Sequence, residues 1–472
     1  MTSTTLYLYH LLPGPLRSAA ASLHGYRLRS WRYGTDTERL VDEALARERW
    51  SVAQWERWQA ARLAFVLHRA ATRVPYYRKH WTERRRKGDR SSWEDLSNWP
   101  ILEKEPLREN PAAFVADDCD VRRMQHETTS GTTFKPLDLW WSRQTTRAWY
   151  GLVEARCLRW YGLSRKDCWA HLGAKWVAPV AQREPPFWVW NSAMRQLYMS
   201  SYHLAPDLVP YYLDALAQYG TKYLWGYPSA LYPLAQGVLQ CGRRDLRMAV
   251  AITDAEQLFD YQRQAISEAF QCPICETYGM AELVAGASEC PAGTLHLWPE
   301  VGRIEVLENG QPVVGSGVGD LIATGLINAD MPLIRYRVGD RGAMGSTQRV
   351  CSCGRSLRAL SSLEGRADHV LYTVDARPVG RLCTVIQGNI PIHEAQIVQE
   401  TLQRVRVRYV PTSTLTREGE HAIVERLRAC MGQVHVVLEA VDRIPRGPNG
   451  KFRTVVCKLP REELHAIQQG SR

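Results

Sequence analysis

The chain has 472 residues, of which 45% are hydrophobic and 23% are charged, and its formal net charge is +11. A chain of this length exceeds the usual size of a single hydrophobic core, so we expect more than one domain. The composition is that of an ordinary globular protein, and the positive charge favours anionic partners such as nucleotides, coenzyme A, an anionic membrane surface or nucleic acid. The dense basic run 84–87 lacks the aromatic residues of a strand-binding groove, so we expect no dedicated nucleic-acid site.

The twelve cysteines are too few for a disulfide scaffold in a chain of this length, and reduced thiols are the default without a secretory segment. Pro13 and Pro15 interrupt the apolar start of the chain, which has no basic region before it and is therefore a poor signal peptide. No run of residues is long and apolar enough to span a bilayer. We therefore predict a cytoplasmic protein, and peripheral contact of the basic, aromatic N-terminus with a membrane stays open.

The first predicted elements are helices. Apolar residues recur with helical spacing between about 37 and 80, and Pro75 is expected to end that helix. Helical patterns also cover 142–163 and the region around 209–216. The segment 172–203 is rich in Trp, Pro and Met and has no clear period. Aromatic side chains offer a large rigid contact area, so this segment is a candidate lining of a substrate pocket.

Strands dominate the predictions further along the chain, with one helix expected at 257–270. Asn309-Gly310 has the composition of the tight turn of a hairpin. Near 365 the composition shifts to that of a smaller α+β tail. The predicted strands, in chain order, are 224–228, 250–253, 274–278, 303–307, 312–314, 321–325, 405–409 and 434–438.

The stretch Thr128–Pro136 combines Thr, Ser, Gly and Lys residues in a few positions. Small hydroxyl side chains and a flexible Gly allow backbone N–H and side-chain O–H groups to converge on an anion. Lys135 adds a positive charge. The stretch is therefore a candidate phosphate-binding loop, and the alternative is a solvated Ser/Thr-rich loop.

Five further motifs follow in order: Gly226-Tyr227-Pro228-Ser229, Tyr278-Gly279-Met280-Ala281-Glu282, Tyr336-Arg337-Val338-Gly339-Asp340, Gly365-Arg366-Ala367-Asp368 and Pro445-Arg446-Gly447-Pro448-Asn449-Gly450-Lys451. The ordered series resembles that of the acyl- and aryl-adenylate-forming enzymes and covers most of the chain. It is most similar to the phenylacetate–coenzyme A ligase branch, and within it to the CapK-like proteins of capsular polysaccharide biosynthesis.

The resemblance implies an α/β fold in two domains. The large N-terminal AMP-binding domain, with β-sheets flanked by helices, is expected at 1–364, and it includes a helical N-terminal extension at about 37–110. The small α+β domain at 365–472 is expected to be a mobile cap.

The resemblance also implies that the hydroxyl-rich loop holds the β- and γ-phosphates of ATP. The residues expected to do so are Ser130, Gly131, Thr132 and Thr133, with Lys135 at the edge. Phe134 stands where the family commonly has Gly, which reduces the flexibility of the loop.

Tyr278 matches the aromatic residue that stacks on adenine, and Gly279 follows it in the nucleotide-binding motif. Glu282 matches the carboxylate that binds Mg²⁺, a hard cation that prefers oxygen ligands. Ala281 replaces the usual Thr or Ser, so one hydroxyl contact is missing or comes from elsewhere. Asp340 matches the acid that binds the ribose hydroxyls. Read without the series, Glu282 is a surface carboxylate and Asp340 a turn residue.

Lys451 matches the C-terminal lysine that contacts the carboxylate substrate and the α-phosphate, and a compact cation suits phosphate. Arg366 and Asp368 match the junction about which the small domain rotates, with Arg366 also assigned to the nucleotide and Asp368 to the hinge. A simple linker turn is the alternative for both. Lining of the substrate pocket is assigned to Tyr227, Pro228 and Ser229.

A second constellation consists of Cys290, His296, Cys351 and Cys353. Three thiolates and one imidazole are enough for a closed tetrahedral Zn²⁺ site, which would be structural. The phenylacetate–coenzyme A ligase branch has a comparable set, which favours this interpretation. The alternative is two buried cysteines beside an unrelated Cys-x-Cys turn.

The resemblance predicts an enzyme that adenylates a small carboxylic acid with ATP and Mg²⁺ and transfers the acyl group, with coenzyme A as the leading acceptor. After Asp368 the tail looks CapK-like, which weakens coenzyme A as the acceptor. One alternative is an amide-forming ligase that acts on an amine of a polysaccharide precursor. Another is a catalytically degenerate nucleotide-binding protein of a surface-glycan pathway. The oligomeric state does not follow from the sequence.

Overall fold

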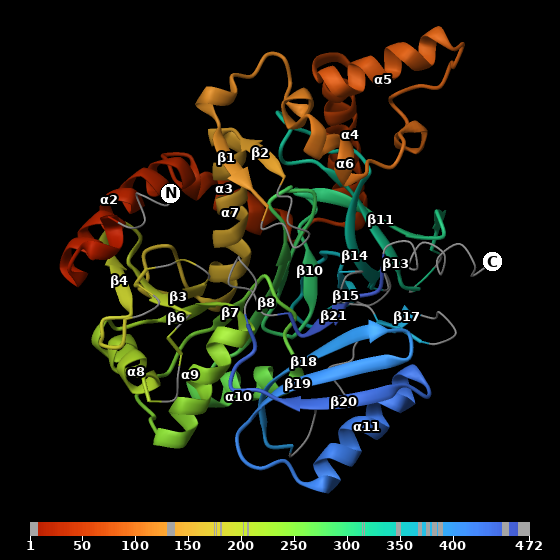
Figure 1. Cartoon of the computed structure of the whole chain (residues 1–472). Coiled ribbons are helices and arrows are strands. Elements are labelled where there is room, and N and C mark those ends of the chain that lie inside the picture. The colour runs from red at the N-terminus through yellow and green to blue at the C-terminus, as the bar shows by residue number, and fades with distance from the viewer. Residues whose placement is uncertain are drawn as a thin grey trace. The chain divides into compact units, whose positions relative to one another are not determined.

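The computed structural model describes residues 8–129, 137–173, 175, 177–179, 182–201, 203–204, 207–313, 315, 317–345, 351–366, 371–373, 378–379, 385, 390–445 and 453–460. The chain divides into two compact units (Figure 1). The first unit comprises Met1–Val338 and Gly342–Ser362, and the second comprises Gly339–Arg341 and Leu363–Arg472. The predicted boundary between 364 and 365 remains a prediction.

Helices open the first unit: α2 (Gly14–Arg32), α3 (Thr37–Arg47), α4 (Val52–Arg73) and α5 (Pro75–Arg86). Helix α4 begins at a capping box, in which Ser51 accepts from the N–H of Gln54 and Gln54 accepts from the N–H of Ser51. Pro75 was predicted to end the helix. Helix α4 does end at Arg73, two residues before it, and Pro75 begins the next helix, α5. Proline is tolerated at the first helical position because its missing N–H has no partner there. Four short helices follow in chain order: η1 (Leu96–Asn98), α6 (Lys104–Glu109), η2 (Pro111–Phe114) and η3 (Val121–Arg123).

The main sheet of the first unit has the strand order β10-β9-β8-β7-β6-β3-β5-β4. Strands β8, β7, β6, β3 and β5 run parallel to one another. At the two sides of this parallel group, β4 pairs antiparallel with β5, β9 pairs antiparallel with β8, and β10 pairs antiparallel with β9. The strand bounds are β3 (Trp169–Gly173), β4 (Trp188–Asn191), β5 (Gln196–Ser200), β6 (Tyr223–Gly226), β7 (Ala251–Thr253), β8 (Ile274–Gly279), β9 (Gly286–Glu289) and β10 (Leu295–Leu297).

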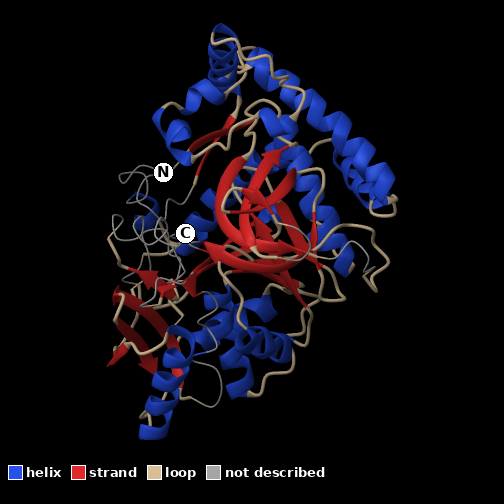
Figure 2. Ribbon diagram, turned by 90° about the vertical axis from the view of Figure 1, so that its right-hand side faces the viewer, coloured by secondary structure: helices blue, strands red, loops and turns tan. Residues whose placement is uncertain are grey.

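Helices cover both faces of this sheet, as Figures 1 and 2 show. On one face Leu224 of β6 packs in a core with α8 (Val209–Gln218), α9 (Pro228–Cys241) and α10 (Asp260–Phe270). On the other face its neighbour Tyr223 packs in a core with α3, α7 (Arg143–Val153) and its continuation η4 (Glu154–Leu158) and η5 (Arg159–Tyr161). Successive residues of a strand face opposite sides of the sheet, so both sides of these parallel strands must be apolar.

A second sheet has the order β12-β11-β13-β14-β15. Its strands are β11 (Gly302–Glu308), β12 (Gln311–Pro312), β13 (Gly319–Gly325), β14 (Tyr336–Met344) and β15 (Leu360–Arg366). The predicted hairpin is confirmed: Leu307 pairs with Pro312, and both Asn309 and Gly310 have positive φ. That conformation is the one that a two-residue type I′ turn requires, and Asn-Gly adopts it readily.

The second unit contains a four-stranded sheet, β20-β19-β18-β21, with helix α11 (Arg417–Met431) packed on one face. Val405 and Val407 of β19 are fully buried against Ile423 and Leu427 of α11. The strands are β16 (Leu371–Tyr372), β17 (Pro378–Val379), β18 (Ile392–Thr401), β19 (Arg404–Pro411), β20 (His435–Ala440) and β21 (Val455–Cys457). The α/β fold class, with a large sheet-and-helix part and an α+β C-terminal part, is confirmed.

The sequence pattern missed several elements, among them α2, α9 and α11 and the strands of the segment 172–203. That segment, which has no clear period, contains β4 and β5 and the short helix η6 (Ser192–Met194). Strand β5 is buried at four of its five positions, so it shows no alternation of polar and apolar residues. Among the helices that the structure describes, none has the length and apolar content needed to cross a bilayer.

Candidate functional site: the carboxyl edge of the parallel strands and a Cys/His cluster

The carboxyl ends of β3, β6, β7 and β8 lie along one edge of the main sheet, here called the carboxyl edge. Two contacts hold its loops together. The N–H of Tyr227 donates to the carbonyl of Leu172 at 3.1 Å, and the Thr277 hydroxyl donates to the carbonyl of Thr253 at 2.8 Å. Ligands of open α/β sheets collect at this edge. Two of the predicted motifs, 226–229 and 278–282, fall there.

Gly226 ends β6 at a point where the backbone of β3 comes very close. A Cβ at this position would lie 2.5 Å from the carbonyl oxygen of Leu172, so only glycine fits. Tyr227 and Pro228 then begin α9, and the N–H of Ser229 donates to Glu256 at 3.2 Å. The predicted substrate-pocket residues therefore occupy the first turn of a helix at the carboxyl edge.

Tyr278 and Gly279 form the end of β8, where Tyr278 pairs with Ala287 and is 9% exposed. A Cβ at Gly279 would lie 3.3 Å from the ring of Trp149, so a larger residue would press on that indole. Glu282 follows in the turn after β8 and accepts a hydrogen bond from the Tyr336 hydroxyl at 2.9 Å. This hydrogen bond orients one carboxylate oxygen of Glu282.

The candidate phosphate-binding loop lies mostly outside the described residues, but the segments on either side of it are described. They belong to the hairpin of β1 (Gln125–Thr128) and β2 (Asp138–Trp141). The N–H of Thr129 donates to the carbonyl of Leu137 at 3.1 Å, and the N–H of Leu137 donates to the Thr129 hydroxyl at 2.9 Å. Trp141 donates its indole N–H to the carbonyl of Ala281 at 3.0 Å. The strand that leaves the loop is thus anchored to the motif that carries Glu282.

Of the remaining predicted site residues, Asp340 is described. Asp340 lies in β14, in the part that belongs to the second unit, four residues after Tyr336. The residues that lie outside the described part of the chain are Ser130, Gly131, Thr132, Thr133, Lys135, Asp368 and Lys451, and the same holds for the side chain of Arg366. Their roles therefore stay predictions.

Two residues at the end of β3 have chemistry that the sequence pattern did not single out. His171 lies 4.7 Å, ring to ring, from Tyr198, and its Nδ1 is buried without a hydrogen bond among the described residues. Desolvation, with the nearby charges of Lys175 and Arg32, lowers the pKa of His171 to about 3, so the ring is neutral at pH 7. Lys175 lies with its Nζ 5.8 Å from the Tyr198 ring centre.

The side chain of Lys175 keeps access to solvent, yet the protein around it is dense enough to lower its pKa by desolvation. A signal for these residues was present in the sequence: a strand ending in Gly173 opens the segment that was predicted to line a substrate pocket. The segment is aromatic-rich, but its Lys175 was not among the predicted site residues.

The Cys/His cluster consists of Cys290, His296, Cys351 and Cys353, whose ligand atoms all lie within 4.8 Å of one another. Cys290 directly follows β9, and His296 lies in β10, so the tight β9–β10 hairpin brings these two side chains together. Gly293 has φ +77° in that turn, a conformation that favours glycine. All four residues belong to the first unit.

The distances fit a tetrahedral metal. The sulfurs of Cys290 and Cys351 are 3.8 Å apart, and Cys353 Sγ lies 3.3 Å from His296 Nε2. Two thiolates bound to one zinc at about 2.3 Å each would be separated by about 3.8 Å in a tetrahedron. His296 Nδ1 lies 2.9 Å from the carbonyl of Leu357, which it reaches as a donor and so leaves Nε2 free to bind a metal. The donor set and its geometry therefore suit Zn²⁺.

Buried groups surround the cluster. Trp160 packs edge-on against the His296 ring at 6.0 Å and donates its indole N–H to Glu48 at 2.8 Å. Arg355 stacks 4.3 Å over Trp160 and donates to the same carboxylate. Burial raises the pKa of Cys290 to about 11. Burial acts in the same direction on Cys351, but hydrogen bonds with Thr294 and Cys353 outweigh it and lower its pKa to about 7.

The chain is similar to known proteins in both sequence and fold. Residues 371–458 match the family model of the CapK C-terminal domain. The chain is 24% identical to protein CapK of Staphylococcus aureus over 297 residues, which span 61% of this chain and 64% of CapK. It is 25% identical to a phenylacetate–coenzyme A ligase of Pseudomonas putida over 425 residues, which span 83% of each chain.

The chain is related to CapK and to the phenylacetate–coenzyme A ligases. The expected resemblance to the adenylate-forming enzymes is thereby confirmed. A solved structure of 2-hydroxyisobutyryl-CoA ligase, in complex with an acyl-AMP, superimposes with a TM-score of 0.65 at 19% identity and covers 90% of this chain and 94% of its own. At that identity the likeness shows a shared fold. The relatives named ligases act on a carboxylic acid and coenzyme A, and the match to CapK leaves about a third of CapK's length uncovered.

Proposed function

We propose that this protein is an acid–thiol-type ligase that activates a carboxylic acid as its acyl-adenylate and then transfers the acyl group. The observation that carries the proposal is the position of two of the ordered motifs, 226–229 and 278–282, which lie at the ends of β6 and β8 at the carboxyl edge. The shared fold and the related ligases support it.

The proposed chemistry has two steps. A carboxylate oxygen of the acid attacks the α-phosphorus of ATP, the bond from that phosphorus to the bridging oxygen breaks, and pyrophosphate leaves. The acceptor then attacks the acyl carbon, the bond to the phosphate oxygen breaks, AMP leaves, and the proton of the acceptor passes to solvent. Negative charge grows on phosphate oxygens in the first step, so catalysis rests on positioning and on cations and donors aimed at those oxygens.

Each predicted residue has a place in that chemistry. Glu282, oriented by Tyr336, would hold Mg²⁺ through a carboxylate oxygen. The hydroxyl-rich loop with Lys135 would bind the outer phosphates, Tyr278 the adenine and Asp340 the ribose. We assign Lys451 to the α-phosphate and the substrate carboxylate. Asp368 is the proposed pivot of a second domain that starts at 365.

The acceptor distinguishes the candidate functions. Coenzyme A is favoured by the related ligases. An amine of a polysaccharide precursor is favoured by the match of 371–458 to the CapK C-terminal domain. A degenerate nucleotide-binding protein is the third alternative, motivated by Phe134 and Ala281.

A direct test measures pyrophosphate release and acyl-AMP, by mass spectrometry, after incubation of the protein with ATP, Mg²⁺ and a library of carboxylic acids. We expect release with a subset of acids, followed by thioester formation when coenzyme A is added. Nucleotide binding without release, across the whole library, would instead identify a degenerate enzyme. Release that stalls at the acyl-AMP with coenzyme A but proceeds with amino sugars would identify the amide-forming alternative.

We also propose that the Cys/His cluster holds a structural Zn²⁺. The four ligands leave no open position for a substrate, so the metal would join the β9–β10 hairpin to the Cys351–Cys353 turn rather than take part in the reaction. A cytoplasmic location, in which these thiols stay reduced, completes the proposal; the cysteines that the structure describes are free thiols.

Peripheral membrane contact is proposed for the outer face of residues 8–27. Leu8, Leu11, Leu16, Leu23 and Tyr26 are each more than half exposed, and Leu23 reaches 75%. The first 35 residues contain no acidic residue, and Arg27 and Arg29 of α2 are exposed, whereas Arg17 is buried. The other face of α2 packs along β4, where Ser22 donates to the carbonyl of Trp190 at 3.3 Å. An apolar, basic face on a docked helix suits an anionic lipid surface.

Vesicle co-sedimentation tests this contact. We expect binding to vesicles with anionic phosphatidylglycerol, weaker binding to pure phosphatidylcholine, and loss of binding in the Leu16→Ser/Leu23→Ser variant. Leu239→Ser, at a residue that is 41% exposed on α9, is the matched control. Equal binding to both vesicle types, or a dimer that disappears with the double substitution, would show that another partner covers this face.

A further inference from the structure

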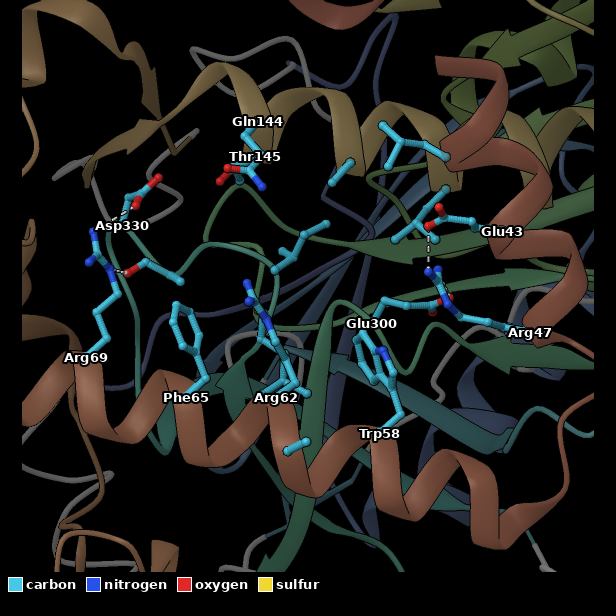
Figure 3. A pocket seen from close by; sticks show the side chains of 17 residues that line it. Glu43, Arg47, Trp58, Arg62, Phe65, Arg69, Gln144, Thr145, Glu300 and Asp330 are labelled. Carbon is cyan, nitrogen blue, oxygen red and sulfur yellow. Dashed lines mark hydrogen bonds and ion pairs between the residues drawn. The ribbon is translucent and has the colours of Figure 1, made fainter. Parts of the chain in front are cut away.

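A cavity of about 570 Å³ lies in the first unit, between α3, α4 and α7 (Figure 3). Its remaining wall comes from Glu300 and from the loop at 326–330, which follows β13. None of the residues predicted to bind nucleotide is among the described residues that line it. The residues assigned to the proposed reaction therefore do not account for this cavity.

Helix α4 contributes an alternating row of aromatic and basic side chains to the cavity. Trp58, Arg62, Phe65 and Arg69 recur at intervals of three and four residues, so they lie on one face of the helix. Figure 3 shows them rising from α4 into the cavity. Phe65 is 49% exposed and Trp58 is partly exposed, so their rings are available for contact.

The arginines at the two ends of the cavity are neutralised. Arg69 forms ion pairs with Asp118 at 2.7 Å and with Asp330 at 3.1 Å. Arg47 pairs with Glu43 at 2.8 Å and lies 3.8 Å from Glu300. These pairs satisfy the charges of Arg47 and Arg69 within the protein.

Arg62, between them, is different. Its Nε donates to the carbonyl of Leu326 at 2.8 Å, and its guanidinium stacks 4.9 Å over the Phe65 ring. Among the described residues, no carboxylate lies within 4.0 Å of it, although it is partly buried. Burial lowers the pKa of Arg62, and the more distant Asp330 only partly opposes this. A partly buried cation without a counter-ion is unfavourable, and an anion beside it would remove that cost.

We propose that this cavity binds a small organic anion that carries one carboxylate or phosphate and an aromatic body. The anionic group pairs with the two Nη atoms of Arg62, whose Nε is already held by Leu326. The aromatic body lies against Trp58 and Phe65 and the aliphatic side chains of Leu152 and Ile327. The volume suits a molecule of one or two rings, since ligand cavities start near 300 Å³.

The site adjoins the strand that leaves the candidate phosphate loop. Thr145, which lines the cavity, lies 3.5 Å from Asn328, and Asn328 donates to the carbonyl of Trp140 in β2 at 3.0 Å. An occupant would therefore contact residues that hold β2. The binding proposal itself does not depend on the proposed adenylation.

The probe for the experiment is 4-fluorophenyl phosphate, whose binding to the full chain is followed by ¹⁹F NMR line broadening. The comparison ligands are 4-fluorophenol, which lacks the anion, and inorganic phosphate as a competitor, which lacks the ring. We expect 4-fluorophenyl phosphate to bind and the phenol not to bind. We expect inorganic phosphate to displace the probe only at much higher concentration.

Arg62→Met keeps an unbranched, flexible side chain and removes the guanidinium and its charge. We expect it to weaken probe binding about 10- to 100-fold, the range for loss of a charged hydrogen bond. Arg57→Met, on the exposed side of the same helix and outside the cavity, is the matched control and should change binding less than twofold. Ala61→Trp, at the cavity lining, should block the probe by filling the space.

Three results would overturn the proposal: no broadening of the probe, broadening that Arg62→Met leaves unchanged, or equal losses in Arg62→Met and Arg57→Met. ATP-dependent pyrophosphate release separates this proposal from the proposed function. Arg62→Met should retain that release within twofold, because Arg62 is not among the residues assigned to nucleotide or acid. Probe binding in a protein that releases no pyrophosphate would leave the cavity site established and the adenylation refuted.

Discussion

The Cys/His cluster and the carboxyl edge are built in different ways. In the cluster, side chains from two distant segments converge to within 4.8 Å inside one unit, and indole and guanidinium groups cover them. At the carboxyl edge, backbone pairing between neighbouring strands brings the motifs together, and Glu282 is held by a single described hydrogen bond from Tyr336. The cluster contains all of its own ligands. The motifs at the edge belong to the first unit, whereas Asp340 belongs to the second unit.

This difference predicts where each substitution will be felt. Damage to a self-contained, buried cluster should appear in stability, because its ligands hold segments of one core together. Damage to the edge, or to the lysine proposed to complete it, should appear in the rate of the first chemical step, because those groups act on charge that develops in the transition state. The four predictions below test that contrast, from the largest expected effect to the smallest.

Lys451→Ala should lower the rate of pyrophosphate release about 10²- to 10³-fold, the loss seen when one preorganised donor is removed from a charge-stabilising site. The melting temperature should not change. Lys458→Ala, at an exposed lysine of the same unit, is the matched control. Equal rates in Lys451→Ala and the unsubstituted protein would remove Lys451 from the proposed reaction.

Cys353→Ser should abolish the bound zinc, measured as metal per chain after gel filtration, and lower the free energy of unfolding by at least about 3 kcal/mol, a fraction of what a structural zinc contributes. Cys241→Ser, at an exposed free thiol, should change neither quantity. Pyrophosphate release at a temperature well below the melting point should persist in Cys353→Ser. A protein that carries no metal and melts unchanged would show that the cluster is a set of buried thiols.

Glu282→Gln should lower pyrophosphate release about 10- to 100-fold at limiting Mg²⁺, as loss of a carboxylate ligand or its outer partner typically does, and raise the Mg²⁺ concentration needed for half-maximal rate. Tyr336→Phe removes the hydrogen bond that orients this carboxylate and should give the same change in smaller measure. Identical Mg²⁺ dependence in all three proteins would contradict a metal role for Glu282.

Glu276 in β8 lies between the two regions, because β8 leads to the carboxyl edge and pairs with β9, which leads to Cys290. Burial raises the pKa of Glu276 to about 7 in spite of the Arg263 guanidinium 3.2 Å away. The folded state therefore holds a proton more firmly than the unfolded state. Its contribution to stability is complete below about pH 4.5, the ordinary range of a glutamate, and is lost as the pH rises through 7.

Glu276→Gln should remove that dependence. The side chain is 29% exposed, so solvent screens part of the effect. We expect the stability difference between the unsubstituted protein and Glu276→Gln to change by about 1–2 kcal/mol between pH 5 and pH 8, in the direction that favours the variant at high pH. Urea unfolding at both pH values measures it, and a pH-independent difference would contradict the raised pKa.

Much of this architecture was predictable from local sequence. The Asn309-Gly310 turn, the strands that lead to Gly226 and Tyr278, and the helix before Glu154 follow from turn chemistry and periodicity, which act over a few residues. Strand β5 was missed because burial on both faces removes the alternation that identifies a strand. Strand β4 was missed because residues on both of its faces, Trp188 to Trp190, are apolar, although their burial alternates. His171 and Lys175 were missed because their chemistry depends on desolvation by neighbours far away in the chain.

By itself, the sequence determined the fold class and the resemblance to CapK and the phenylacetate–coenzyme A ligases, and it predicted which groups could bind ATP or zinc. Those properties reside in residue type, order and short-range spacing. Only the tertiary structure decided that four cysteine and histidine side-chain atoms meet within 4.8 Å, that Glu282 is oriented by Tyr336, and that Arg62, in a cavity between three helices, has no carboxylate of the described residues within 4.0 Å. Distances, desolvation and charge pairing between remote residues arise only when the core packs, so they cannot be predicted from the periodicity of the sequence.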